Sequence, residues 1–103
     1  MFIAKVNGNV VATQKIQAMS GRKLLIVEPL QVDEKTKKMK PTGRCLVAVD
    51  SIGAGTDDTV LVTQGSSARM TEITSDSPVD CVIIGIIDTI TALGEQVYSK
   101  EAT

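Results

Sequence analysis

Short runs of aliphatic residues, separated by turn-forming residues, recur along the whole chain. Val, Ile and Thr account for 12, 10 and 11 of the 103 residues, so about a third of the side chains are β-branched. Such side chains pack well on pleated strands but lose rotamer freedom in helices. No helical periodicity alternates with these runs, and the pattern therefore predicts an all-β barrel or sandwich.

The individual runs predict the positions of the strands. Phe2 to Val6 alternates, meets Asn7-Gly8-Asn9 and continues as Val10 to Gln14, which predicts a hairpin because Asn-Gly is a strong turn signal. Gly85, inside a continuous apolar run, indicates a bulge, a bend or a close backbone approach. Further strands are expected at residues 23–30, 44–50, 59–64 and 81–87, with a last short strand at 94–98.

Two segments lack a strand pattern. Residues 32–43 carry four lysines and end in Pro-Thr-Gly without an apolar period, so a solvated, mobile loop is expected there. Ser66 to Thr71 has the composition of one helical turn capped by a serine hydroxyl. We expect a single domain over residues 1–103, folded as a small five-stranded OB-like Greek-key β-barrel with one short helix and extra short strands.

The chain contains no histidine. This removes the usual general base, the usual zinc ligand and the Ser-His and Cys-His nucleophile pairs. Two adjacent acids remain, Asp57 and Asp58, but neighbouring carboxylates in a glycine-containing turn are far more often a solvated tip than a catalytic dyad. We therefore expect no catalytic residues, no metal site and no cofactor.

The charge balance also limits the partners. With 11 Lys+Arg against 12 Asp+Glu, the net charge of −1 gives no global field for nucleic acid or an anionic membrane. The first residues reach charge too early for a signal sequence, and no apolar run approaches the roughly 18 residues of a membrane span, so a cytoplasmic protein is expected. In a reducing cytosol, Cys45 and Cys81 are expected to be small buried hydrophobes.

A lysine-rich segment leaves a second function open. An OB-type nucleic-acid-binding module could use the four lysines of residues 32–43 for phosphate contacts. Single-strand binders also stack bases on aromatic side chains, and Phe2 and Tyr98, at opposite ends of the chain, are the full aromatic set. A solvated loop flanked by Asp33 and Glu34 is therefore the favoured interpretation. The four lysines are Lys35, Lys37, Lys38 and Lys40.

The segment Gly53-Ala54-Gly55 has the look of half a phosphate-binding loop, since glycine lets backbone N–H groups approach a ligand. However, it precedes no predicted helix and lacks the lysine of a P-loop. Asp57 and Asp58 follow it closely and would repel phosphate. A plain tight turn is therefore favoured.

Four stretches of the chain, taken in order, form a recognisable signature. They are Ala4-Lys5-Val6 with Gly8 and Val10-Val11-Ala12-Thr13; Val47-Ala48-Val49-Asp50-Ser51-Ile52-Gly53-Ala54-Gly55; Val60-Leu61-Val62 with Gly65-Ser66-Ser67-Ala68-Arg69; and Pro78-Val79-Asp80 with Ile83-Ile84-Gly85-Ile86-Ile87-Asp88. Together they resemble the EutN/CcmL family of bacterial microcompartment vertex proteins. The sequence departs from the family at Asp57-Asp58, where Gly-Glu is common, and in the length of the 32–43 segment.

The resemblance implies a structural subunit. Members of this family form homopentamers that close the vertices of a polyhedral shell, whose facets are made by different, hexameric shell proteins. A homopentamer in the shell of a cytoplasmic microcompartment is therefore expected, with no nucleic acid or membrane partner. By the same resemblance, two loops are expected at the subunit interface or around the central pore, with turns inside one subunit as the alternative: Gly53, Ala54, Gly55, Thr56, Asp57 and Asp58, then Gly65, Ser66, Ser67 and Arg69.

Overall fold

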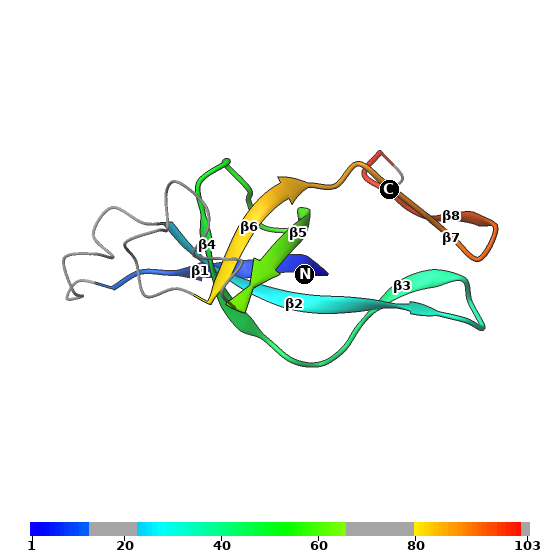
Figure 1. The fold of residues 1–103 in the computed structure, drawn as a ribbon, viewed down its shortest axis with the longest axis horizontal. Helices are drawn as coiled ribbons and strands as arrows, with labels where there is room; N and C mark the ends of the chain where they lie inside the picture. Colours follow the sequence, from blue (N-terminus) through cyan, green and yellow to red (C-terminus); the bar gives the residue numbers. More distant parts are fainter. Residues whose placement is uncertain (13–22, 66–79, 102–103) are drawn as a thin grey trace.

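A computed structural model describes residues 1–12, 23–65 and 80–101 of the chain. Every regular element in these ranges is a strand (Figure 1). No helix among the described residues is long and apolar enough to cross a membrane. The strands are β1 (Phe2–Val10), β2 (Lys23–Asp33), β3 (Lys38–Pro41), β4 (Leu46–Asp50), β5 (Thr59–Gln64), β6 (Cys81–Ile86), β7 (Thr89–Ala92) and β8 (Glu95–Ser99).

Five of the strands close into a barrel. Their order is β1-β5-β6-β4-β2, and β2 pairs again with β1 to complete the ring. The β4–β6 pair is parallel, while the other pairs of the barrel are antiparallel. The structure thus confirms the predicted closed five-stranded β-barrel with extra short strands. The helical turn predicted at residues 66–71 lies outside the described residues.

Small aliphatic side chains fill the barrel. Because successive side chains of a strand point to opposite faces, alternate residues of each barrel strand face inward. This explains why the strands predicted at 44–50, 59–64 and 81–87 are confirmed with close bounds. The buried interior consists of Ala4, Val6, Leu25, Val27, Ala48, Ala54, Val60, Val62, Cys81 and Ile83.

The hairpin predicted around Asn7-Gly8 is wrong. β1 runs through both residues without turning, and its register with β2 shifts between Val6 and Gly8. The glycine therefore marks a β-bulge, which bends a long strand around a barrel corner and is the other common role of glycine in a strand. The Asn7 side chain donates a hydrogen bond to Glu28 on β2, at 2.9 Å, instead of forming a turn.

The mobile loop predicted at residues 32–43 is also wrong. β2 continues to Asp33, and β3 pairs with its outer half to form a hairpin that we call the arm (residues 30–41). Asp33 shapes the tip, because its carboxylate accepts a hydrogen bond from the Lys35 N–H at 2.9 Å. The Lys37 N–H closes the turn on the Asp33 carbonyl at 2.7 Å. Pro29 lies where β2 leaves the barrel, in agreement with the edge or bend that its missing N–H predicts.

The end of the described chain forms a second hairpin. The predicted strand at 94–98 is confirmed as β8, whereas its partner β7 was not predicted. Both hairpins lie on the same side of the barrel, to the right in Figure 1, and make the molecule elongated, with extents of 45 × 24 × 23 Å. Lys37 on the arm and Glu95 on β8 form an ion pair at 3.2 Å. The barrel and the paired hairpins are therefore two distinct regions.

Candidate subunit interface at the loop after β4

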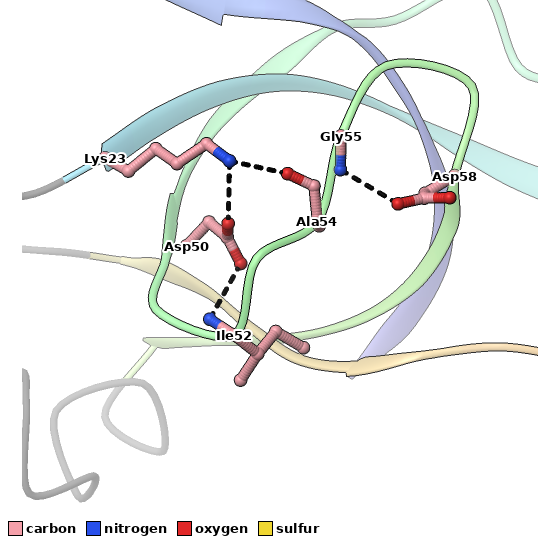
Figure 2. Close-up of polar contacts among 6 residues, drawn as sticks. All are labelled: Lys23, Asp50, Ile52, Ala54, Gly55 and Asp58. Carbon is pink, nitrogen blue, oxygen red and sulfur yellow. Dashed lines mark hydrogen bonds and ion pairs between the residues drawn. The ribbon is translucent and has the colours of Figure 1, made fainter.

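A buried carboxylate organises the loop that follows β4. The Asp50 side chain is completely inaccessible, and its Oδ1 accepts a hydrogen bond from the Ile52 N–H at 3.1 Å. Its Oδ2 has no hydrogen-bond partner among the described residues, but the Lys23 Nζ lies 3.4 Å away (Figure 2). The ion pair therefore balances a charge that would be costly to bury alone.

The same lysine also holds the loop itself. Lys23 and Asp50 are register partners on β2 and β4, and the lysine Nζ also donates a hydrogen bond to the Ala54 carbonyl at 2.7 Å. Ala54 is fully buried in the barrel core. Gly53 has a φ of +89°, a left-handed conformation that glycine adopts without steric cost. One cation thus connects two strands and the loop between β4 and β5.

The second half of the loop is a tight turn. The Gly55 N–H donates to the Asp58 carboxylate at 2.8 Å (Figure 2), and the Asp58 N–H donates to the Gly55 carbonyl at 3.0 Å. Asp57 has a φ of +75°, so an aspartate occupies a left-handed position that glycine adopts most readily. The Gly55 N–H is already bonded to a carboxylate of this chain, which disfavours the phosphate-loop interpretation.

Backbone hydrogen bonds anchor this turn to β1. The Asp57 N–H donates to the Val6 carbonyl, and the Val6 N–H donates to the Asp58 carbonyl, both at 2.9 Å. Val6 lies next to the bulge of β1, so the bend in that strand and the turn meet at the same place. An exposed ion pair between Lys5 and Asp57, at 3.7 Å, adds little. The loop is consequently a rigid projection of the barrel.

The two predicted interface segments lie apart. Gly53 to Asp58 precedes β5, while Gly65 follows it, with a φ of +70° and its N–H bonded to the Asp80 carbonyl at 2.9 Å. The six residues of β5 separate the two segments by roughly 20 Å. Ser66, Ser67 and Arg69 lie outside the described residues. Among the predicted residues that the structure describes, Gly53 to Asp58 and Gly65 are therefore not brought together within one subunit.

Exposed aliphatic side chains lie on the outer face of the barrel beside the loop. Val47 on β4 is 53% exposed, Ile84 on β6 is 40% exposed and Ile52 in the loop is 45% exposed. Ile84 is the residue that a bulge adds to β6 opposite Leu61 and Val62, and this confirms the bulge predicted from Gly85. A Cβ added at Gly85 would lie 3.7 Å from the Leu61 Cβ, an ordinary contact, so no close approach among the described residues of the subunit explains the glycine.

The two thiols and the acids of the described residues show no reactive arrangement. Cys81 is buried as predicted, but Cys45 is exposed, because it precedes β4 in the connection from the arm and has no strand partner to cover it. No group of three or more Cys, Asp and Glu side chains among residues 1–12, 23–65 and 80–101 is placed to hold a metal ion. Asp57 is exposed and Asp58 is bonded within its own turn. The two acids of the loop therefore form a rigid turn and no catalytic pair.

Sequence reasoning missed the lysine that holds the site. Asp50 belongs to the quoted signature, whereas Lys23 stands at the start of a strand and reads as an ordinary surface lysine. Its role depends on the β2–β4 register, which places it opposite Asp50. A pattern along one strand carries no information about this cross-strand pair.

These features define a class of protein: a closed barrel of small aliphatic side chains with a rigid loop and an apolar outer face beside it. The family model described as "Ethanolamine utilisation protein EutN/carboxysome" matches residues 1–88. The chain belongs to this EutN/CcmL family.

Individual relatives match almost the whole chain. The bacterial microcompartment shell vertex protein EutN of Salmonella typhimurium is 43% identical over 97% of this chain and 96% of its own. The structure of CcmL from Gloeobacter violaceus has a TM-score of 0.86 and 40% identity, covering 98% and 99% of the two chains. The pentameric microcompartment shell protein GrpN from Rhodospirillum rubrum has a TM-score of 0.73 and 38% identity, covering 90% and 99%.

Proposed function

We infer that this chain is a structural subunit of a bacterial microcompartment shell, where it forms homopentamers that occupy the vertices. The observation that carries the inference is a match over nearly the full length, in sequence and in fold, to shell vertex proteins that include a pentameric one. The protein is accordingly structural rather than catalytic and works in the cytoplasm, at the shell.

A ring of identical subunits joined head to tail needs two different, complementary surfaces on each subunit. The exposed aliphatic side chains of Val47, Ile52 and Ile84 supply one apolar surface. Branched aliphatic groups of this kind gain free energy when a neighbour covers them, about 25 cal/mol for each Å² removed from water. Their position on β4, β6 and the loop between β4 and β5 favours that side of the barrel as one half of the contact.

We propose that the loop Gly53 to Asp58 lies in this contact. Its support is mechanical, because the Lys23–Asp50 ion pair and the bonds to Val6 fix its shape before association. A preorganised loop loses little conformational entropy on binding. Gly65 lies at the other end of β5, and we assign it to the second of the two surfaces that a head-to-tail ring requires. Ser66, Ser67 and Arg69 are proposed for the same surface by resemblance to the family alone.

The partners beyond the ring are proposed on the same basis. A flat lattice of hexamers does not enclose a volume, so five-fold units supply the curvature of a closed shell. We therefore propose hexameric shell proteins as the neighbours of the pentamer, without cofactor, nucleic acid or membrane partners. The OB-type nucleic-acid-binding alternative predicts strong, salt-dependent binding of single-stranded DNA, which fluorescence anisotropy at low salt would detect.

Native mass spectrometry tests the pentamer directly. Five copies of the 10.9 kDa chain give a particle of roughly 55 kDa, which should persist at micromolar concentration. A stable monomer at that concentration would contradict the proposal. Co-expression with a hexameric shell protein extends the test: electron microscopy should show closed polyhedra with this chain and open sheets or tubes without it.

A further inference from the structure

The turn between β7 and β8 carries an unusual residue. The register pairs Ala92 with Glu95, so Leu93 and Gly94 form a two-residue turn, and both have positive φ, +53° and +78°. Turns of this kind favour Asn, Asp or Gly at the first position, because a branched or bulky side chain is strained in the left-handed region. Leu93 is nevertheless there, with 52% of its surface exposed. The leucine therefore serves neither the turn nor the core of its own subunit.

The hairpin that carries Leu93 is held in place. The Glu95 carboxylate pairs with Lys37 on the arm at 3.2 Å, and Val97 beside it is only 6% exposed. At the base, the Lys100 N–H donates to the Asp88 carbonyl at 2.7 Å. Figure 1 shows the tip of the hairpin pointing away from the barrel. An apolar side chain is thus presented to the surroundings in a defined position.

A pocket of about 360 Å³ lies where the barrel, the arm and the β7–β8 hairpin meet, and we call it the junction pocket. Leu30, Met39 and Tyr98 are half-buried and form an apolar wall. Asp57, from the loop proposed for the subunit contact, lies at its rim, so the pocket is continuous with that surface. The full lining is Lys5, Leu30, Met39, Pro41, Asp57, Thr59, Tyr98, Ser99 and Lys100.

The Leu93 of a subunit does not reach its own junction pocket. Tyr98, which lines the pocket, pairs with Ile90, and Leu93 lies three residues beyond Ile90 toward the tip. At about 3.3 Å for each residue, the leucine is displaced by roughly 10 Å away from the pocket wall. Leu93 could therefore enter the junction pocket of another subunit only.

We propose that Leu93 of one subunit inserts into the junction pocket of the next subunit around the ring. This inference rests on the proposed homopentamer and assigns one of its contacts. A closed ring requires a contact between two different parts of the same chain, and the projecting Leu93 side chain, together with the apolar wall of the junction pocket elsewhere on the molecule, meets that requirement. The pocket is at the small end of the range of about 300–1,000 Å³ typical of ligand sites and is large enough to admit one aliphatic side chain.

Two variants of Leu93 separate a role in the ring from a role in the turn. Leu93→Asn suits the left-handed position but removes the apolar side chain, so the subunit should melt at the same or a higher temperature while the pentamer weakens. We expect the concentration at which half of the pentamer dissociates to rise about ten- to hundredfold. Leu93→Met keeps an apolar side chain and the strain, and should change that concentration less than about threefold. Native mass spectrometry across a dilution series measures both.

Disulfide trapping locates the contact. On a Cys45→Ser background, Leu93→Cys combined with Met39→Cys should give a covalent ladder up to the pentamer after mild oxidation with diamide, because only subunits in contact bring the thiols within bonding distance. Each cysteine variant alone should remain uncrosslinked. A wild-type monomer would overturn the proposed function itself. If the wild type is a pentamer but Leu93→Asn leaves it intact, or the double-cysteine variant gives no ladder, this inference alone is overturned. The same holds if Leu93→Asn abolishes only the binding of a hexameric shell protein.

Discussion

The barrel and the arm each use a lysine–carboxylate pair, but in very different surroundings. In the barrel, the Asp50 side chain is completely buried beneath Lys23. Between the arm and the β7–β8 hairpin, Lys37 and Glu95 are 50% and 51% exposed. An exposed pair typically contributes about 0–1 kcal/mol, whereas breaking a buried pair leaves a charge without compensation and costs about 3–5 kcal/mol. The Lys23–Asp50 pair is therefore essential to the barrel loop, whereas the Lys37–Glu95 pair contributes little to the stability of the hairpins.

This contrast predicts the largest effect for Lys23→Met. The substitution keeps the aliphatic stem but leaves the buried Asp50 carboxylate without its cation. We expect the free energy of unfolding to fall by about 2–3 kcal/mol, less than for a fully buried pair because the lysine is half exposed. Urea unfolding of the variant measures the loss. The double variant Lys23→Met/Asp50→Asn should recover most of it, and a loss below about 0.5 kcal/mol would remove the distinction between the two regions.

The second prediction concerns the surface that the ion pair supports. Ile52→Asp places a charge on the exposed aliphatic surface and does not touch the barrel core. The subunit should keep its circular dichroism spectrum and melting temperature, while the pentamer dissociates at a concentration about thirtyfold higher, the effect of losing an interface side chain worth about 2 kcal/mol. Ile52→Val, which stays apolar, is the matched control. Equal dissociation of all three proteins would exclude this face from the ring.

The two thiols should differ in reactivity, which extends the comparison between the barrel and the arm. Burial in the barrel, and secondarily the neighbouring Asp80 carboxylate, raises the pKa of the Cys81 thiol, whereas Cys45 is exposed in the connection from the arm. Since the thiolate is the nucleophile, iodoacetamide at pH 8 should label Cys45 at least about tenfold faster than Cys81. Mass spectrometry of timed samples gives both rates. The raised pKa also means that unfolded chains lose this proton first, so stability declines as the pH rises above about 9.

The barrel could be predicted from the sequence, and the arm could not. Strands of the barrel are largely buried, which gives the run of aliphatic and β-branched residues that predicts β5 at Thr59–Gln64 with the right bounds. The arm packs few side chains on a core, so Lys38 to Pro41 has no such pattern although it forms a strand. The hairpin predicted at Asn7-Gly8 is wrong for another reason: the residues that favour a turn also favour a β-bulge.

The candidate site likewise contains residues that could be predicted from the sequence and residues that could not. The glycines of the loop were predicted as site residues by resemblance to the family, whose signature also contains Asp50, but no role was predicted for that carboxylate. Lys23 and the Val6 backbone reach the loop through cross-strand register. Register follows from closure of the whole barrel, so the residues that fix the loop became evident only in three dimensions.

The smallest predicted effect concerns the exposed ion pair between Lys37 and Glu95. Glu95→Gln removes the exposed ion pair between the hairpin and the arm but keeps the size of the side chain. We expect the free energy of unfolding to fall by less than about 0.5 kcal/mol in low salt, and the difference from wild type to vanish near 1 M salt, because exposed charges are screened. Thermal melts in both conditions measure it, with Lys37→Met as the matched partner variant. A loss as large as that of Lys23→Met, insensitive to salt, would mean that the hairpin is built into the fold as firmly as the barrel loop, and the distinction between the two ion pairs would not hold.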